Sequence, residues 1–173
     1  MCMCVALFTA CSMAPEDLSM RGRVYGYQSA PAFTHVSTDR YASELADDIS
    51  IDVWISTQAA AAYLAIDPDV DGSQIELPDG TVIVREVHDL ATGELQKLTV
   101  MVKGPIGVVP EMDDWWFAVT DAEGDPLLDD TGAEQAGEMP QCQSCHLDRK
   151  DDGYLFGVPA PVRLPASDLR QAI

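Results

Sequence analysis

Four segments in the middle of the chain have the pattern of β-strands, because apolar and β-branched residues recur in them with a period of two. They are residues 51–55, 82–88, 98–103 and 115–119. Turn residues separate them, with Pro78 and Gly80 before the second segment and Thr92-Gly93 before the third. This order predicts an α+β, mainly β fold: an antiparallel β-sheet of four or five strands with short helices.

Short helices are predicted beside these strands. Residues 57–64 have an alanine-rich helical pattern, with Ser56 or Thr57 as its N-cap. Residues 39–46 predict one or two helical turns. Residues 14–38 are mixed polar and predict a linker that leads into the domain.

The first 13 residues are short and apolar, which is typical of the central part of a secretory signal. Phe8-Thr9-Ala10-Cys11 resembles a lipoprotein cleavage box, in which Cys11 is the lipidation candidate. No lysine or arginine precedes Arg21, so the alternative is an apolar tail on a cytosolic protein. We expect a signal-like segment and linker over residues 1–25 and the folded domain over residues 26–173.

The charge excludes several classes of partner. The chain has 29 Asp and Glu against 10 Lys and Arg, a formal net charge of -19. Nucleic acids and anionic membrane surfaces need a basic face, so neither is expected as a partner. No run of about 18 apolar residues occurs, so no transmembrane helix is expected. Residues 111–134 are acidic without a basic residue, and we prefer ordinary solvation over a docking face as their interpretation.

Cys142-Gln143-Ser144-Cys145-His146 has the spacing C-x-x-C-H, the attachment signature of haem c. Two thiols one helical turn apart can each add to a vinyl group of one porphyrin, and the next histidine supplies a nitrogen to the iron. We therefore predict one covalent haem c per chain on a C-terminal haem-attachment helix. Cys142 and Cys145 are its attachment sites, and His146 is the proximal iron ligand.

Other uses of the motif fit less well. A thioredoxin-like pair needs no histidine and belongs near the start of an α/β fold. A zinc site needs four ligands, and the only further histidines are His35 and His88, which we interpret as surface residues. A disulfide between Cys142 and Cys145 is a strained alternative.

No residue stands out as a second axial ligand. The segment after His146 contains neither Met nor His. Met101, Met112 and Met139 lie upstream and have the right chemistry. The alternative is an open distal position, which favours binding of NO, CO, O₂ or hydroxylamine over electron transfer.

Beyond the haem motif, several segments in order resemble the cytochrome P-460 family, over roughly residues 45–160. They are residues 53–55 with the following helix, 77–86, 98–103, 114–117, 142–146 and 152–156. The resemblance implies an antiparallel sheet, a periplasmic location, often a homodimer, and His146 as proximal ligand. The family includes enzymes that oxidise hydroxylamine or NO with a lysine-crosslinked haem. It also includes the cytochrome c-prime-beta relatives, which lack the crosslink and bind gases.

The chain departs from the enzymes of that family at three positions. Their crosslinking lysine matches Arg85, their distal carboxylate falls near Thr99 and their distal arginine falls near Ile51. A guanidinium stays protonated and is a poor nucleophile, and Lys97 and Lys103 do not match the crosslink position. Without the carboxylate, the base that would take protons from hydroxylamine is missing. Arg85 and Thr99 are therefore candidate distal residues of a haem without the crosslink.

Arg85 also has a structural interpretation. On a strand it shares a face with Ile83 and Val87, where a charge is costly unless it is paired or near solvent. It is either a donor to a haem ligand or propionate, or half of a salt bridge at the sheet edge. Residues 115–117 are interpreted as core and haem-wall residues.

Together these features predict a periplasmic mono-haem c-type cytochrome that is secreted or lipid-anchored. We expect it to bind or redox-process NO or hydroxylamine at an open distal site. The alternatives are a hydroxylamine or NO oxidoreductase, a non-catalytic gas-binding protein and a simple electron carrier. A redox protein and a second copy of the chain are the macromolecular partners considered.

Overall fold

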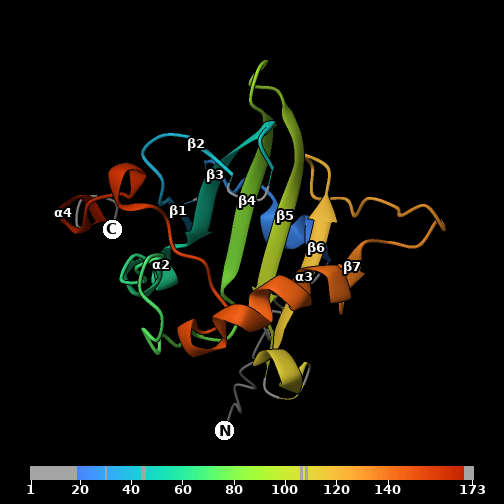
Figure 1. Cartoon of the computed structure of the whole chain (residues 1–173). Coiled ribbons are helices and arrows are strands. Elements are labelled where there is room, and N and C mark those ends of the chain that lie inside the picture. Colours follow the sequence, from blue (N-terminus) through green and yellow to red (C-terminus); the bar gives the residue numbers. More distant parts are fainter. Residues whose placement is uncertain (1–18, 30, 44–45, 106, 108, 170–173) are drawn as a thin grey trace, which may run out of the picture.

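An antiparallel β-sheet forms the centre of the computed structural model, which describes residues 19–29, 31–43, 46–105, 107 and 109–169. The strand order is β1-β3-β4-β5-β6-β7, and β2 pairs with β3 beside this path (Figure 1). The strands are β1 (Phe33–His35), β2 (Tyr41–Ala42), β3 (Ile49–Ser56), β4 (Val82–Asp89), β5 (Leu95–Lys103), β6 (Trp115–Thr120) and β7 (Ala136–Gly137). The predicted mainly β fold with short helices is confirmed.

The helices are short and lie around the sheet. They are α1 (Met20–Val24), α2 (Thr57–Tyr63), η1 (Pro110–Met112), α3 (Pro140–His146), η2 (Leu147–Asp152), η3 (Ala160–Val162) and α4 (Ala166–Leu169). Within the described ranges, no helix combines the length and apolar character that crossing a membrane requires.

The four strands with a clear period of two are the four long strands β3, β4, β5 and β6. The described sheet has seven strands rather than four or five, because β1, β2 and β7 have only two or three residues each. Segments of that length carry no detectable periodicity, and they become strands only through pairing with a neighbour.

Two local predictions were wrong for this reason. Residues 39–46 were expected to be helical, but Tyr41 and Ala42 pair with Ile51 and Ser50 on the edge of β3. The described part of residues 14–38, expected to be a linker, forms α1 and β1 instead. Tertiary pairing and packing override a weak local preference in both places.

The two faces of the sheet have different partners. The α1 face packs Val84, Leu98 and Val100 against Met20 and Val24 of α1. The opposite face, called the α3 face here, carries Val53, Arg85, Thr99 and Val119 in one row across β3 to β6. On β5 the α1-face side chains of Leu98, Val100 and Val102 are fully buried, whereas Lys97, Thr99 and Met101 on the α3 face are only partly buried. The α3 face therefore keeps an accessible strip along β5.

The haem motif lies on α3, which crosses the ends of β4, β5 and β6 on this face (Figure 1). Met139, the N-cap residue, is buried in the main core, and Pro140 occupies the first turn. Pro is favourable there because the first turn leaves its N–H groups without helical partners. Cys142 packs against the same core, so the helix is fixed at its start.

Candidate haem site

The two cysteines of the motif lie one helical turn apart on α3. Both thiols are free, Cys142 is partly buried and Cys145 is exposed. Burial raises the pKa of the Cys142 thiol, the neighbouring Cys145 raises it further, and Lys97 opposes the shift. The spacing predicted from the sequence is therefore realised on a helix, with one thiol against the sheet and one toward solvent.

His146 ends α3 and is held from three sides. Its Nδ1 lies 2.6 Å from the backbone oxygen of Tyr154. Phe117 and Phe156 flank the imidazole at centroid distances of 5.0 and 5.1 Å. A ring whose Nδ1–H donates to a carbonyl presents Nε2 as its free ligand nitrogen.

The electrostatic surroundings favour the neutral form of this imidazole. Burial lowers the pKa of His146, and the Arg85 guanidinium lowers it further, while the Tyr154 carbonyl acts in the opposite direction. A neutral imidazole is the form that binds a metal. The charge of Arg85 on β4 therefore acts on the imidazole at the end of α3.

Arg85 and Thr99 are direct cross-strand neighbours on the α3 face. The Thr99 hydroxyl donates to the Arg85 backbone oxygen over 3.5 Å, and Arg85 Nη2 lies 3.4 Å from the Ser43 hydroxyl. Both side chains are partly buried, as a binding strip next to solvent requires. Arg85 forms no ion pair within the described part of the chain, so its interpretation as half of a salt bridge has no support there.

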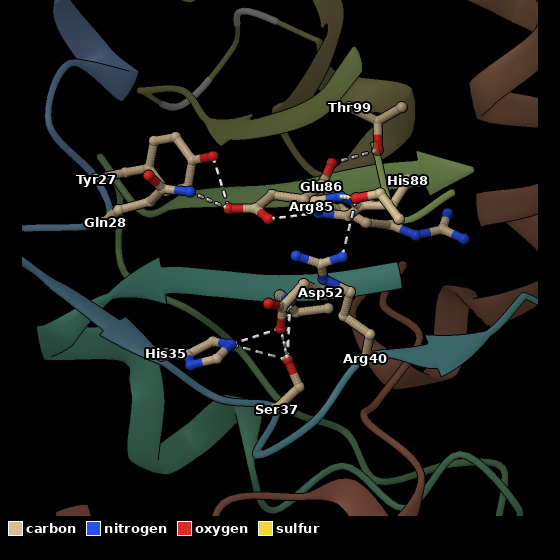
Figure 2. A network of polar contacts seen from close by, with 12 residues as sticks. Tyr27, Gln28, His35, Ser37, Arg40, Asp52, Arg85, Glu86, His88 and Thr99 are labelled. Carbon is tan, nitrogen blue, oxygen red and sulfur yellow. Dashed lines mark hydrogen bonds and ion pairs between the residues drawn. The ribbon is translucent and has the colours of Figure 1, made fainter. Parts of the chain in front are cut away.

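Glu86, the next residue on β4, belongs to the opposite face. Figure 2 shows its side chain extending toward Tyr27 and Gln28, while Arg85 extends the other way. Glu86 accepts hydrogen bonds from Tyr27 (2.7 Å), Gln28 (2.6 Å) and His88 Nε2 (2.6 Å). The alternation of a strand thus keeps this carboxylate away from Arg85 and the α3 face.

The other predicted positions have separate roles. Ile51 is fully buried on the α3 face. Met112 and Met139 are buried in the core, whereas Met101 is partly buried beside Ile83 and Phe117. Among the methionines considered as ligands, Met101 alone shares the accessible strip with Thr99.

The two remaining histidines take part in polar contacts. The prediction that His88 is a surface residue was wrong, because its side chain is buried against Glu86. Its Nδ1 lies 3.2 Å from the Gly93 backbone oxygen. His35 is partly exposed, stacks on Trp54 at 4.3 Å and contacts Asp52 at 2.5 Å. The partner of His35, Asp52, lies on the neighbouring strand β3 and is invisible in the local sequence, whereas the partner of His88, Glu86, lies two residues earlier on β4 itself.

The aromatic segment that begins β6 divides between the two faces of the sheet. Trp115 and Phe117 are buried, and Phe117 touches His146. Trp116 points to the other face, where Arg23 lies over its ring at 5.4 Å. The core assignment is confirmed for Trp115 and Phe117, and the role of the segment as a haem wall stays a prediction.

Sequence reasoning assigned no role in the site to Tyr154, Phe156 and Lys97. Lys97 had a signal, because it precedes Thr99 by two residues and so shares its face. The Tyr154 carbonyl had none, because its direction depends on an uncommon backbone conformation. Cys11 and the remainder of residues 1–18 lie outside the described residues.

The residues of the site fit a haem better than a bare metal ion. In the described ranges, no three His, Cys, Asp or Glu side chains gather as a metal cage. His146 offers a single free nitrogen, two free thiols lie within the turn that precedes it, and two aromatic rings flank it. One nitrogen ligand with two thiols for attachment is the donor set of haem c.

The fold and this motif define a class of protein: a mainly antiparallel β protein with a C-x-x-C-H helix after the sheet. A family model, Cytochrome P460, matches residues 25–157. Because the match covers most of the chain, the protein belongs to the cytochrome P460 family, and this membership implies haem binding. The comparison with curated proteins gave no match.

Proposed function

We propose that this chain is an exported mono-haem c-type cytochrome that binds or redox-processes NO or hydroxylamine at an open distal site. Cys142 and Cys145 would hold the haem through thioether bonds, and His146 Nε2 would bind the iron. The haem, when bound, supplies a redox-active iron that can take a small ligand. We propose further that it lacks a lysine crosslink.

The observation that carries the proposal is the pairing of Arg85 with Thr99 on the same sheet face as α3. This row also contains Val53 and Val119, so it combines one fixed cation and one hydroxyl with apolar side chains. A guanidinium donates hydrogen bonds to oxygen or nitrogen atoms of a small ligand and keeps its charge at every physiological pH. Such a row favours holding a polar diatomic or hydroxylamine.

The same row argues against hydroxylamine oxidation as the main activity. That reaction releases protons as well as electrons, and a general base close to the substrate must accept them. Thr99 and Arg85 are poor bases, and Glu86 faces away from this row. Binding of NO or hydroxylamine therefore fits the residues better than turnover does.

The absorption spectrum of the purified holoprotein tests the proposal. We expect haem that stays on the chain in a denaturing gel, and a high-spin reduced spectrum that shifts on addition of NO or CO. A strongly red-shifted Soret band would indicate a crosslinked haem and overturn the no-crosslink claim. A sharp low-spin α band that does not change on addition of either gas would assign the protein to electron transfer, with Met101 as the first ligand to test.

Export rests on chemistry rather than on the signal-like segment alone. Haem is attached to C-x-x-C-H motifs outside the cytoplasm, so a covalent haem on Cys142 and Cys145 would require transport. The mass of the N-terminus of the native protein tests both export and acylation. A mature chain that begins at an acylated Cys11 supports the lipid anchor, whereas an intact, unmodified N-terminus contradicts both.

A further inference from the structure

The hydrogen-bond acceptor of His146 is the backbone oxygen of Tyr154, a residue with an uncommon backbone conformation. The Tyr154 carbonyl lies 2.6 Å from Nδ1 of His146. Tyr154 has φ 66° and follows Gly153, whose φ is also 66°. Few residues other than glycine adopt left-handed φ values, and such a conformation persists only where the surroundings hold it. The contacts of this turn therefore decide where the acceptor of His146 points.

Trp115 holds the turn from the sheet. Its indole nitrogen donates to the Gly153 backbone oxygen over 3.1 Å, and the side chain is only 1% exposed. Tyr154 N donates to the Arg149 oxygen over 2.8 Å, which closes the turn onto η2. A Cβ at Gly153 would lie 2.3 Å from the Ile75 oxygen, so the chain passes too close here for any other residue.

Asp152 holds the turn from the opposite side. Its side chain is buried, at 1% exposure, although it carries a charge. One carboxylate oxygen accepts from Gly72 N (3.0 Å), Ser73 N (2.7 Å) and the Ser73 hydroxyl (2.7 Å). The other lies 3.1 Å from Arg149 Nη2. Asp152 thus ties the 72–73 loop and η2 to the residues that follow it.

We propose that Asp152 and Trp115 are positioning residues for the haem: they fix the Gly153–Tyr154 turn and so hold the Tyr154 carbonyl on Nδ1 of His146. This inference rests on the proposed function, because it requires His146 to bind the iron. A carbonyl that accepts from Nδ1–H increases electron donation by the imidazole and favours ferric over ferrous iron. A displaced carbonyl raises the reduction potential.

The test compares Asp152→Asn and Trp115→Phe with the wild-type holoprotein. Asp152→Asn removes the charge that binds the loop, and Trp115→Phe removes one N–H donor while an aromatic ring stays in the core. We expect each variant to shift the ferric-to-ferrous equilibrium about tenfold toward ferrous iron. This is the lower end of the effects that follow the loss of a hydrogen-bond partner of a metal ligand. For one electron that is a rise of about 59 mV in potential.

Asp151→Asn is the matched control. It removes the carboxylate charge of the neighbouring residue, whose side chain is exposed. Its potential should equal that of the wild type. The iron–histidine stretching frequency, read by resonance Raman spectroscopy, should fall in the two variants and not in the control. If Asp152→Asn yields no folded holoprotein, Trp115→Phe decides the question alone.

Two failures are distinguishable. Variants that carry covalent haem with the potential and stretching frequency of the wild type would overturn the positioning role and leave the proposed function intact. A wild-type chain without covalent haem, made with the haem-attachment machinery, would overturn the proposed function itself.

Discussion

Arg85 is the residue on which the proposed ligand chemistry depends. It lies in register with Thr99 and Val53, and its guanidinium influences His146. Charge on an apolar sheet face is costly unless solvent or a partner compensates for it. Partial exposure and the contact with Ser43 account for its tolerance here.

The substitution Arg85→Leu tests this residue. We expect the holoprotein to keep its haem but to bind hydroxylamine about 10- to 150-fold more weakly, because a hydrogen bond from a charged donor contributes about 1.5–3 kcal/mol. Spectrophotometric titration measures the affinity. Arg85→Lys keeps the cation and should lose less. Equal affinity in the wild type and Arg85→Leu would remove Arg85 from the binding site.

Asp52 is a second residue with a measurable electrostatic role. Burial raises the pKa of its carboxyl, but hydrogen bonds from His35 and Ser37, each 2.5 Å long, outweigh this and lower the pKa overall. A lowered carboxyl pKa adds stability above the unfolded value, about 3.9, and loses it as the pH falls through the folded value.

The variant Asp52→Asn should therefore be less stable than the wild type at pH 7, with a smaller difference near pH 3. The melting temperature, measured by circular dichroism from about pH 7 to pH 3, follows this change. Asp79→Asn, at an exposed turn, is the control. A difference that is constant across the pH range would show that the charge of Asp52 contributes nothing.

At the scale of the element, β4 separates two chemistries by alternation. Arg85 faces α3, and Glu86 faces the N-terminal segment, where Tyr27, Gln28 and His88 surround its carboxylate. The carboxylate is buried, and it accepts hydrogen bonds from Tyr27 and Gln28. This network ties the residues after α1 to the centre of the sheet.

The variant Glu86→Gln should lower the free energy of unfolding by about 1–3 kcal/mol, because an amide accepts fewer hydrogen bonds than a carboxylate and leaves a buried polar group without its partner. Urea denaturation gives this value. Glu94→Gln, on the exposed side of the following turn, is the matched control and should change little. If both variants lose the same stability, the buried network does not anchor the N-terminal segment.

At the scale of the whole molecule, the dominant property is a net charge of -19. Like charges on a folded surface repel one another and destabilise the compact state. Salt screens this repulsion, because the Debye length falls from about 30 Å at 0.01 M to about 3 Å at 1 M.

We therefore expect the melting temperature at pH 7 to rise when sodium chloride is raised from about 0.01 M to 1 M. Differential scanning calorimetry measures it. The rise should shrink near pH 4, where many carboxylates are protonated. A melting temperature that falls with salt at pH 7 would mean that attractive ion pairs such as Arg21–Asp125 outweigh the repulsion.

The long elements of the fold were predictable, and the short ones were not. The period of two located β3 to β6 and the hairpin at Gly93, whose φ is 74°. β2 and β7 have two residues each and owe their strand conformation to pairing with β3 and β6. Local sequence contains no information on a partner that lies far along the chain.

The candidate site divides in the same way. The proposed attachment residues Cys142 and Cys145 and the proposed iron ligand His146 follow from the spacing of one motif, because adjacent turns of a helix are set by local geometry. Arg85 and Thr99 were candidates by family resemblance, and strand register brings them together. The position of Lys97 near Cys142 and the contact of Tyr154 with His146 required the assembled chain.

The sequence by itself therefore determined the mainly β class, the C-x-x-C-H motif on which the haem c prediction rests, and the absence of a lysine at position 85. These properties depend on residue identity and short-range spacing. Only the tertiary structure decided which face of β4 meets α3, that His88 is buried beside Glu86, and how a left-handed turn aims a carbonyl at His146. These depend on contacts between segments up to 80 residues apart, such as Gly72 with Asp152, which packing and register fix together.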